Sequence, residues 1–209
     1  MKRLLISAAA VFVTGALVVA QDTRPPSPLG TAAAHVLGKY APAPSGRGQT
    51  YQDGKCIEIS YSRPLKRGRE LWGSGADYGK GLLVGAPIWR AGANVSTRLK
   101  TEAPLVIGGK TVAPGEYSLF IDLKENNWTF VVSNWGALVQ YNPQNKEALW
   151  GAFNYTPDKD VLRAPMKLET LAHSTEELTW EFLDMTPTGG TLAIRWDKVM
   201  ASVPFTVTR

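Results

Sequence analysis

Hydrophobic and polar residues alternate with a period of two over most of the chain after residue 55. Ile57, Ile59 and Tyr61 fall on one side of the first such run, and the residues between them are more polar. This alternation is typical of β-strands that bury one face. The apolar rows of the five later runs are Tyr117, Leu119, Ile121 and Leu123; Trp128, Phe130 and Val132; Leu178, Trp180 and Phe182; Leu192, Ile194 and Trp196; and Val203, Phe205 and Val207.

Turn signals separate these runs. The segments 125–127 and 186–190 have the composition of hairpin turns, and no long amphipathic helical pattern occurs in the sequence. Short strands at regular spacing predict a sandwich or barrel. We therefore expect an all-β protein with a single antiparallel, jelly-roll-like β-sandwich over residues 27–209, a length that forms a core without disulfides.

Two further features refine the predicted sheets. Pro165 lies inside the apolar run 162–168, which places this strand at a sheet edge because proline cannot donate to a ladder. The outward positions of the late strands are polar, and their charges can pair across neighbouring strands. Such a surface is either a polar binding face or, more commonly, a solvated one. These outward residues are Lys167, Thr179, Glu181, Arg195 and Asp197.

The first 20 residues have the pattern of a secretory signal peptide. Lys2 and Arg3 precede an uncharged stretch that runs to Ala20, and polar residues follow. We expect cleavage after Ala20, the alternative being an uncleaved anchor. The mature protein is then exported, periplasmic or secreted, with no transmembrane segment. Residues 21–26 are expected to be a linker, Thr31–Leu37 a first strand, and the Pro- and Gly-rich stretch around 39–54 a mobile insertion.

Charge and composition exclude several classes of function. The chain has 23 Lys and Arg against 18 Asp and Glu, and without Lys2 and Arg3 the balance is 21 − 18 = +3. Nucleic acid is not an expected partner, because its binding needs clustered cations. The single cysteine, Cys56, cannot form an intrachain disulfide.

The sequence also lacks the common catalytic and cofactor motifs. His35 and His173 are the only histidines, and neither has a zinc-ligand spacing. A nucleophile elbow, a phosphate-binding loop and a dinucleotide fingerprint are all missing. We therefore predict no metal site and no cofactor, and these motifs identify no catalytic residue.

Arginine, tryptophan and asparagine gather in three irregular segments, 62–72, 88–94 and 150–155. Loops on a rigid β-scaffold often carry binding groups, and these side chains suit anions, sugars or planar groups. The competing interpretation makes the tryptophans core residues and the arginines partners of backbone carbonyls. The candidate ligand-binding residues are Arg67, Arg69, Trp72, Trp89, Arg90, Asn94, Trp150 and Asn154.

Six stretches spread over the chain match the motifs of one bacterial family. They are SPLGTAAAHVLG at 27–38, ISYSRPLKRGRELWG at 59–73, IWRAGAN at 88–94, IGGKTVAPGEYSLF at 107–120, WGAFNY at 150–155 and WDKVMASVPFTV at 196–207. Through these motifs the chain resembles domain-of-unknown-function family 2911. The resemblance implies an exported, β-sandwich-like domain and supports a first strand at 31–37, but it implies no activity. The chain departs from the family pattern by longer segments before Cys56 and at 73–81.

Three functions follow as hypotheses. The leading one is a non-enzymatic module that binds a small molecule or glycan, such as a carbohydrate or another envelope component. The second is a hydrolase or lyase that acts on a saccharide through two carboxylates in one groove. The third is a structural or assembly protein of the cell envelope, which requires an open sheet edge or an exposed apolar patch. Candidate carboxylates for the second are Glu58, Asp122, Glu181 and Asp197.

Overall fold

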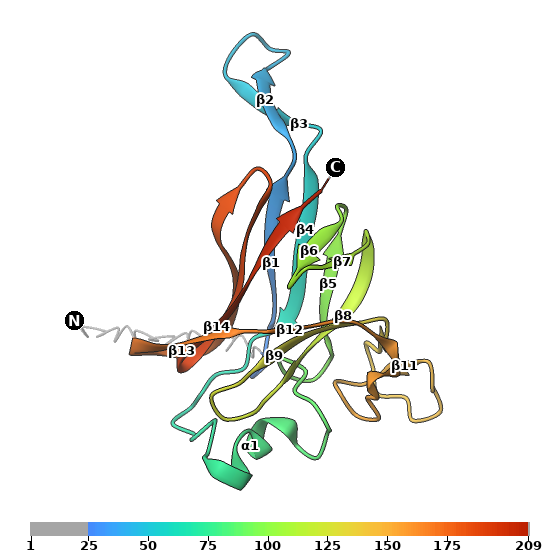
Figure 1. The fold of residues 1–209 in the computed structure, drawn as a ribbon, viewed down its shortest axis with the longest axis vertical. Helices are drawn as coiled ribbons and strands as arrows, with labels where there is room; N and C mark the ends of the chain where they lie inside the picture. Colours follow the sequence, from blue (N-terminus) through green and yellow to red (C-terminus); the bar gives the residue numbers. More distant parts are fainter. Residues whose placement is uncertain (1–24, 209) are drawn as a thin grey trace, which may run out of the picture.

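A computed structural model describes residues 25–208 of the 209-residue chain. The predicted signal peptide therefore lies outside the described residues. Two antiparallel sheets dominate the described part, which confirms the all-β, sandwich-like prediction (Figure 1). No helix of the described part is long and apolar enough to cross a membrane.

The larger sheet has six strands and contains the first strand of the fold. Pairing throughout is antiparallel, and β12 forms the edge, as Pro165 predicts. The strand order is β1 (Leu29–Val36), β4 (Lys55–Ser62), β5 (Thr97–Thr101), β8 (Gly115–Asp122), β9 (Thr129–Ser133) and β12 (Asp160–Pro165).

The smaller sheet has four strands, two of which are long. The prediction of separate strands at 192–196 and 203–207 is wrong, because one strand runs through both segments despite Pro204. Its partner is interrupted by register shifts between Thr170 and Thr179. The order is β13 (Lys167–Thr186), β14 (Gly189–Val207), β6 (Leu105–Ile107) and β7 (Lys110–Val112).

Short elements complete the structure. A parallel ribbon joins β10 (Gly136–Ala137) and β11 (Ala148–Leu149), and one helical turn forms α1 (Lys80–Leu83). Two 3-10 turns lie at Gly75–Asp77 and Pro157–Lys159.

Residues 39–54, predicted as a mobile insertion, form an antiparallel ribbon of β2 (Lys39–Pro42) and β3 (Gln49–Gln52) that projects beyond the sandwich (Figure 1). The Tyr51 hydroxyl accepts a 2.9 Å hydrogen bond from the amide of Gly38. A Cβ at Gly38 or Gly54 would lie 2.3 or 2.2 Å from the Tyr51 ring, so both glycines make room for it. The mobility of the ribbon stays a prediction.

The main core lies between the two sheets and follows the predicted alternation. Ile57, Ile59 and Leu119 of the larger sheet are fully buried, and the Phe130 and Trp180 rings meet across the sheets with centroids 6.2 Å apart. A second, smaller core lies on the other face of β8 and β9. It contains Ala86, Ile88, Phe120, Val131, Trp135, Leu149, Ala152 and Tyr155. Both faces of the central strands are therefore buried, so Phe120 and Val131, which fall between the positions of the predicted apolar rows, are core residues as well.

Candidate functional site

The first predicted segment, residues 62–72, lies against the smaller sheet. Arg69 donates hydrogen bonds to the Leu65 and Lys66 carbonyls at 2.6 and 2.9 Å, and its guanidinium lies 5.7 Å from the centre of the Trp196 ring. Arg67 is exposed, and its backbone amide donates to Glu176. Arg69 thus fits the competing interpretation, in which an arginine satisfies backbone carbonyls.

Four tryptophans, Trp72, Trp89, Trp128 and Trp196, pack together at one end of the main core. Their ring centroids lie 4.8–6.4 Å apart. Trp72 is 8% exposed and Trp89 only 1%. These two predicted site residues are therefore part of the core, and neither has a ring face open to a ligand.

The second and third predicted segments lie side by side. Ser96 donates a 2.5 Å hydrogen bond to the Gly151 carbonyl. Gly151 has a φ of +65°, and a Cβ there would lie 2.7 Å from Nη1 of Arg90 and 2.9 Å from the Asn94 carbonyl oxygen. The structure thus brings the segments that carry Arg90, Asn94, Trp150 and Asn154 together, and the first segment meets the second through the Trp72 and Trp89 rings.

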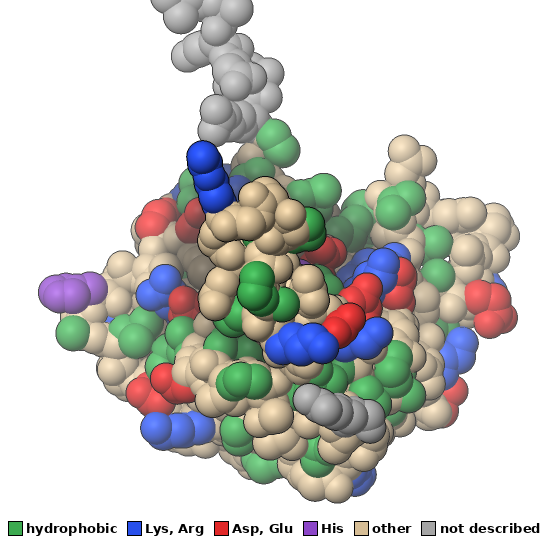
Figure 2. Space-filling view, turned by 90° about the horizontal axis from the view of Figure 1, so that it is seen from above, with side chains coloured by type: hydrophobic (Ala, Val, Ile, Leu, Met, Phe, Trp, Pro, Cys, Tyr) green, Lys and Arg blue, Asp and Glu red, His purple; other side chains and the backbone are tan. Residues whose placement is uncertain are grey.

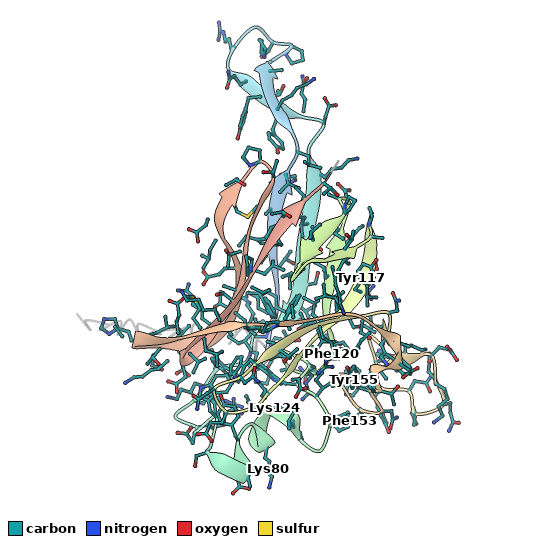
Figure 3. The ribbon with its side chains drawn as sticks, in the orientation of Figure 1. Lys80, Tyr117, Phe120, Lys124, Phe153 and Tyr155 are labelled. Atoms are coloured by element: carbon teal, nitrogen blue, oxygen red, sulfur yellow. The ribbon has the colours of Figure 1, made fainter. Side chains whose placement is uncertain are left out.

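A cavity of about 490 Å³ opens beside this junction, and we call it the loop hollow. Residues of the connection between β10 and β11 line it, and the Leu138 amide donates a 2.9 Å hydrogen bond to the Leu149 carbonyl. Figure 3 shows Phe153 beside Tyr155 and Phe120, so the second core supports the hollow from behind. The lining residues are Leu138, Tyr141, Asn142, Pro143, Asn145, Lys146, Ala148, Trp150, Phe153 and Asn154.

Three asparagine side chains line the loop hollow. The Asn142 and Asn145 side-chain oxygens accept backbone amides of their own loop, at 2.9–3.0 Å. Their Nδ2 groups, like the Asn154 side chain, have no hydrogen-bond partner in the described part of the chain. Lys146, the one charged lining residue, donates to the Pro143 carbonyl at 2.9 Å. The hollow is thus aromatic and amide-rich, with one cationic side chain in its lining.

Sequence reasoning predicted Trp150 and Asn154 but missed the other side of the hollow. Tyr141, Asn142 and Asn145 belong to the long polar segment 134–149, which has no strand periodicity. The only feature of this segment that indicates a binding role is the combination of asparagines with a tyrosine. Its separation from Trp150 in the sequence does not show that the two lie together in space.

Next to the second core lies a cluster of charged groups. Arg163 binds Asp122 at 2.6 Å and Asp160 at 3.0 Å, and the Tyr155 hydroxyl donates to Asp160 at 2.6 Å. Burial and the hydrogen bond to Asp160 raise the pKa of Tyr155 above its ordinary value. Because Arg163 of β12 pairs with Asp122 of β8 as well as with Asp160, this cluster holds β8 and β12 together across β9.

The four carboxylates of the hydrolase hypothesis do not converge. Each has a different partner, and they lie on β4, β8, β13 and β14. A two-carboxylate mechanism needs both groups in one groove. Among the described residues, no two of these four carboxylates are placed in this way. The pairs are Glu58 with Ser60, Asp122 with Arg163, Glu181 with Arg195, and Asp197 with Lys66.

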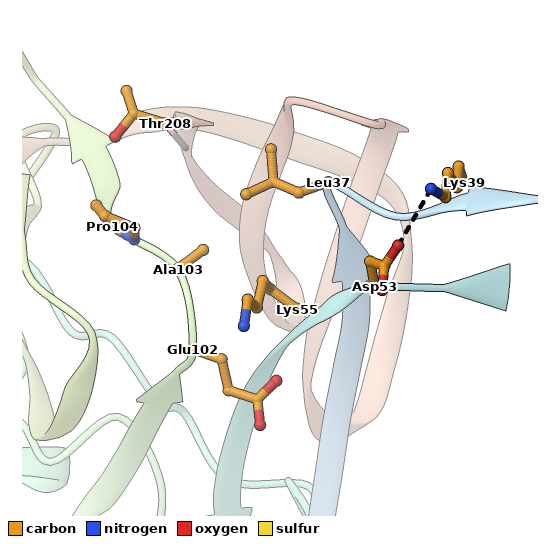
Figure 4. A pocket seen from close by; sticks show the side chains of 8 residues that line it. All are labelled: Leu37, Lys39, Asp53, Lys55, Glu102, Ala103, Pro104 and Thr208. Carbon is orange, nitrogen blue, oxygen red and sulfur yellow. Dashed lines mark ion pairs between the residues drawn. The ribbon is translucent and has the colours of Figure 1, made fainter.

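A larger cavity, of about 540 Å³, lies at the base of the projecting ribbon (Figure 4). Lys39 and Asp53 form a 3.3 Å ion pair at its edge, and Leu37, Ala103 and Pro104 form apolar walls. It contains none of the predicted site residues and no aromatic ring, which makes it the weaker candidate for a polar organic ligand.

The described part of the chain contains neither a metal-binding cluster nor an activated thiol. No group of three or more His, Cys, Asp or Glu side chains there is placed to hold a metal ion. Cys56 is partly buried, and burial, Glu102 and Glu58 raise the pKa of its thiol. A raised thiol pKa makes the thiolate scarce at neutral pH, so Cys56 is not an activated nucleophile.

The two packed sheets and the loop hollow define an all-β sandwich with an open cavity at its loops. A family model described as "Protein of unknown function (DUF2911)" matches residues 43–205, and the chain belongs to this family. The match confirms the resemblance found in the motifs. Comparison with curated proteins and with solved structures gave no match. Because the family description assigns no activity, a function has to be argued from the site.

Proposed function

We propose that the protein is a non-catalytic binding module that takes a neutral saccharide in the loop hollow. The observation that carries the proposal is the combination of Trp150, Phe153 and Tyr141 with the unpartnered Nδ2 group of Asn142 and the unpartnered side chain of Asn154. Aromatic faces pack on the C–H surface of a sugar ring, and amides exchange hydrogen bonds with hydroxyl groups. A cavity of about 490 Å³ is within the range of small-molecule sites.

Two features support a binding role over a catalytic one. Near the second core, Arg163 forms ion pairs with both Asp122 and Asp160, so neither carboxylate there is unpaired. Lys146 is the one charged side chain that lines the hollow, and its ammonium is bound to a carbonyl. Export to the periplasm or medium is part of the proposal and rests on the sequence pattern of residues 1–20.

The test is isothermal titration calorimetry with a panel of neutral oligosaccharides. We expect binding to the wild type, and binding weakened by at least about tenfold in Trp150→Ala and Asn154→Gly, a difference of about 1.4 kcal/mol. Glycine is chosen because Asn154 has a φ of +63°. Tyr117→Ala is the control, since Tyr117 is partly buried like Trp150 but lies outside the hollow. Absence of binding to the whole panel, or equal binding by Trp150→Ala, would refute the proposal.

The projecting ribbon favours a second candidate, an assembly role. Tyr40 is 71% exposed, Met185 is 37% exposed, and both line a cavity of about 250 Å³ with His35 and Tyr51. On the face viewed in Figure 2, down the projecting ribbon, Lys and Arg are interspersed with Asp and Glu, so no single charge covers it. Exposed aromatic patches often mark protein contacts. Sedimentation of the wild type and of Tyr40→Ser tests this role, which requires self-association that the variant loses.

A further inference from the structure

The strongest feature outside the loop hollow is the guanidinium of Arg90. Its Nε is fully buried and, like the other nitrogens of the group, has no hydrogen-bond partner in the described part of the chain. The other partly buried arginines each pair with a carboxylate: Arg63 with Glu177, Arg98 with Glu116, and Arg195 with Glu181. Arg90 is the exception among them.

An unpaired, partly buried cation is unfavourable, because it loses water without gaining an anion. Burial accordingly lowers the pKa of the Arg90 guanidinium. Five N–H donors in a planar fork match a carboxylate or phosphate group, which would supply the missing charge and acceptors.

The backbone around Arg90 is fixed before any ligand binds. Trp89 and Ile121 exchange two backbone hydrogen bonds, at 3.1 and 2.9 Å. The Ala91 carbonyl accepts from Trp180 at 3.0 Å and from Thr97 at 3.0 Å. A fixed backbone reduces the entropy that is lost on binding.

The loop that follows adds further donors. The backbone amides of residues 90–96 donate to no acceptor within residues 25–208. Ala91 and Asn94 have φ values of +50° and +58°, and left-handed residues in such turns orient successive N–H groups toward anions. The Arg90 side chain packs against Gly151, where a Cβ would lie only 2.7 Å from Nη1, so the absence of a side chain at residue 151 lets the guanidinium take this position.

We propose that Arg90 and the loop 90–96 form a binding site for an oxyanion, a carboxylate or phosphate group. The site stands apart from the saccharide proposal, since Arg90 does not line the loop hollow and the anion is recognised by charge.

The test measures thermal unfolding of the protein against inorganic phosphate and, separately, acetate, at constant ionic strength. We expect a saturable rise of Tm in the wild type with at least one of the two anions, and the two arms distinguish phosphate from carboxylate. Arg90→Gln should lose the saturable part, with apparent affinity weakened by at least about tenfold. Its Tm without anion should be no lower than that of the wild type, because an uncompensated charge is removed.

Arg47→Gln is the matched control, since it removes the same charge from an exposed loop of the projecting ribbon. It separates specific binding from the general stabilisation that phosphate gives to folded proteins. NMR titration of the amides of residues 91–95 with phosphate and acetate gives a readout that does not depend on stability. A wild type that responds to neither anion, or an Arg90→Gln protein that responds like the wild type, would overturn the proposal.

Discussion

The ammonium of Lys66 lies 2.6 Å from the carboxylate of Asp197, although the two residues are 131 positions apart in the sequence. Ser174 donates a second hydrogen bond to the same oxygen, at 2.7 Å. The side chains of Lys66 and Asp197 are only 23% and 14% exposed. This pair therefore fastens the irregular segment after β4 to the smaller sheet.

Asp197→Asn should lower the free energy of unfolding at pH 7 by about 1–3 kcal/mol, since it removes the charge that two donors satisfy. Urea denaturation measures the change. Asp77→Asn is the control, because the Asp77–Lys80 pair is exposed and such pairs contribute little. Equal effects of the two substitutions would contradict the assigned role.

The Lys66–Asp197 pair also predicts a pH dependence. Burial disfavours the charged form of Asp197, but the hydrogen bonds from Lys66 and Ser174 outweigh it and hold its pKa below the ordinary value. Its contribution to stability is therefore present above about pH 4, the ordinary aspartate pKa, and is lost as the pH falls through the lower pKa of the folded state. Below about pH 4, the free energy of unfolding should decrease more steeply with falling pH in the wild type than in Asp197→Asn. Urea denaturation at a series of pH values measures both, and equal slopes would contradict the prediction.

Two tryptophans of the predicted site should respond differently to truncation. Trp89→Ala should destabilise the protein by about 3–5 kcal/mol, because it empties part of the tryptophan cluster. Trp150→Ala should have a smaller effect, since Trp150 is only partly buried at the wall of the loop hollow. Guanidinium denaturation measures the free energy of unfolding of both variants. A larger loss of stability in Trp150→Ala than in Trp89→Ala would contradict the assignment of Trp89 to the core.

Tyr155→Phe should cost about 1 kcal/mol, because Oδ2 of Asp160 loses a donor while Oδ1 already lacks one. The raised pKa of Tyr155 means that the folded state keeps its proton longer than the unfolded state. Stability is lost as the pH rises above about 10, and this loss should be shallower in Tyr155→Phe than in the control Tyr40→Phe. Denaturation at high pH checks both; identical slopes would show that Tyr155 does not titrate differently on folding.

Gly151→Ala should destabilise the protein by about 1–3 kcal/mol, since alanine is strained at a φ of +65° and its Cβ would meet Nη1 of Arg90. Gly81→Ala serves as the comparison, because Gly81 lies in α1 with open space at its Cβ position. Alanine favours a helix there, so that variant should be as stable as the wild type or more so. Thermal unfolding distinguishes the two substitutions.

The sheets were predictable because strand periodicity is a local property. Ile57 and Leu119 alternate with polar neighbours, and each residue of such a row meets the same face of the core. The burial of Phe120 and Val131 could not be predicted, because the loops that cover the outer face of β8 and β9 come from distant segments of the sequence. The loop hollow was half predictable for the same reason: Trp150 and Asn154 share a motif, whereas Tyr141 reaches them only through the closure of β10 on β11.

The projecting ribbon has a consequence for how the chain can change in length. Val36 and Lys55 are paired neighbours at the last position of the β1–β4 ladder, and no side chain of residues 38–54 belongs to either core. A two-residue turn could join β1 to β4 directly and leave the sandwich closed. The segment between β1 and β4 can therefore be shortened, lengthened or exchanged. Such a change would alter the surface that the molecule presents to a partner but leave the packing of the sandwich unchanged.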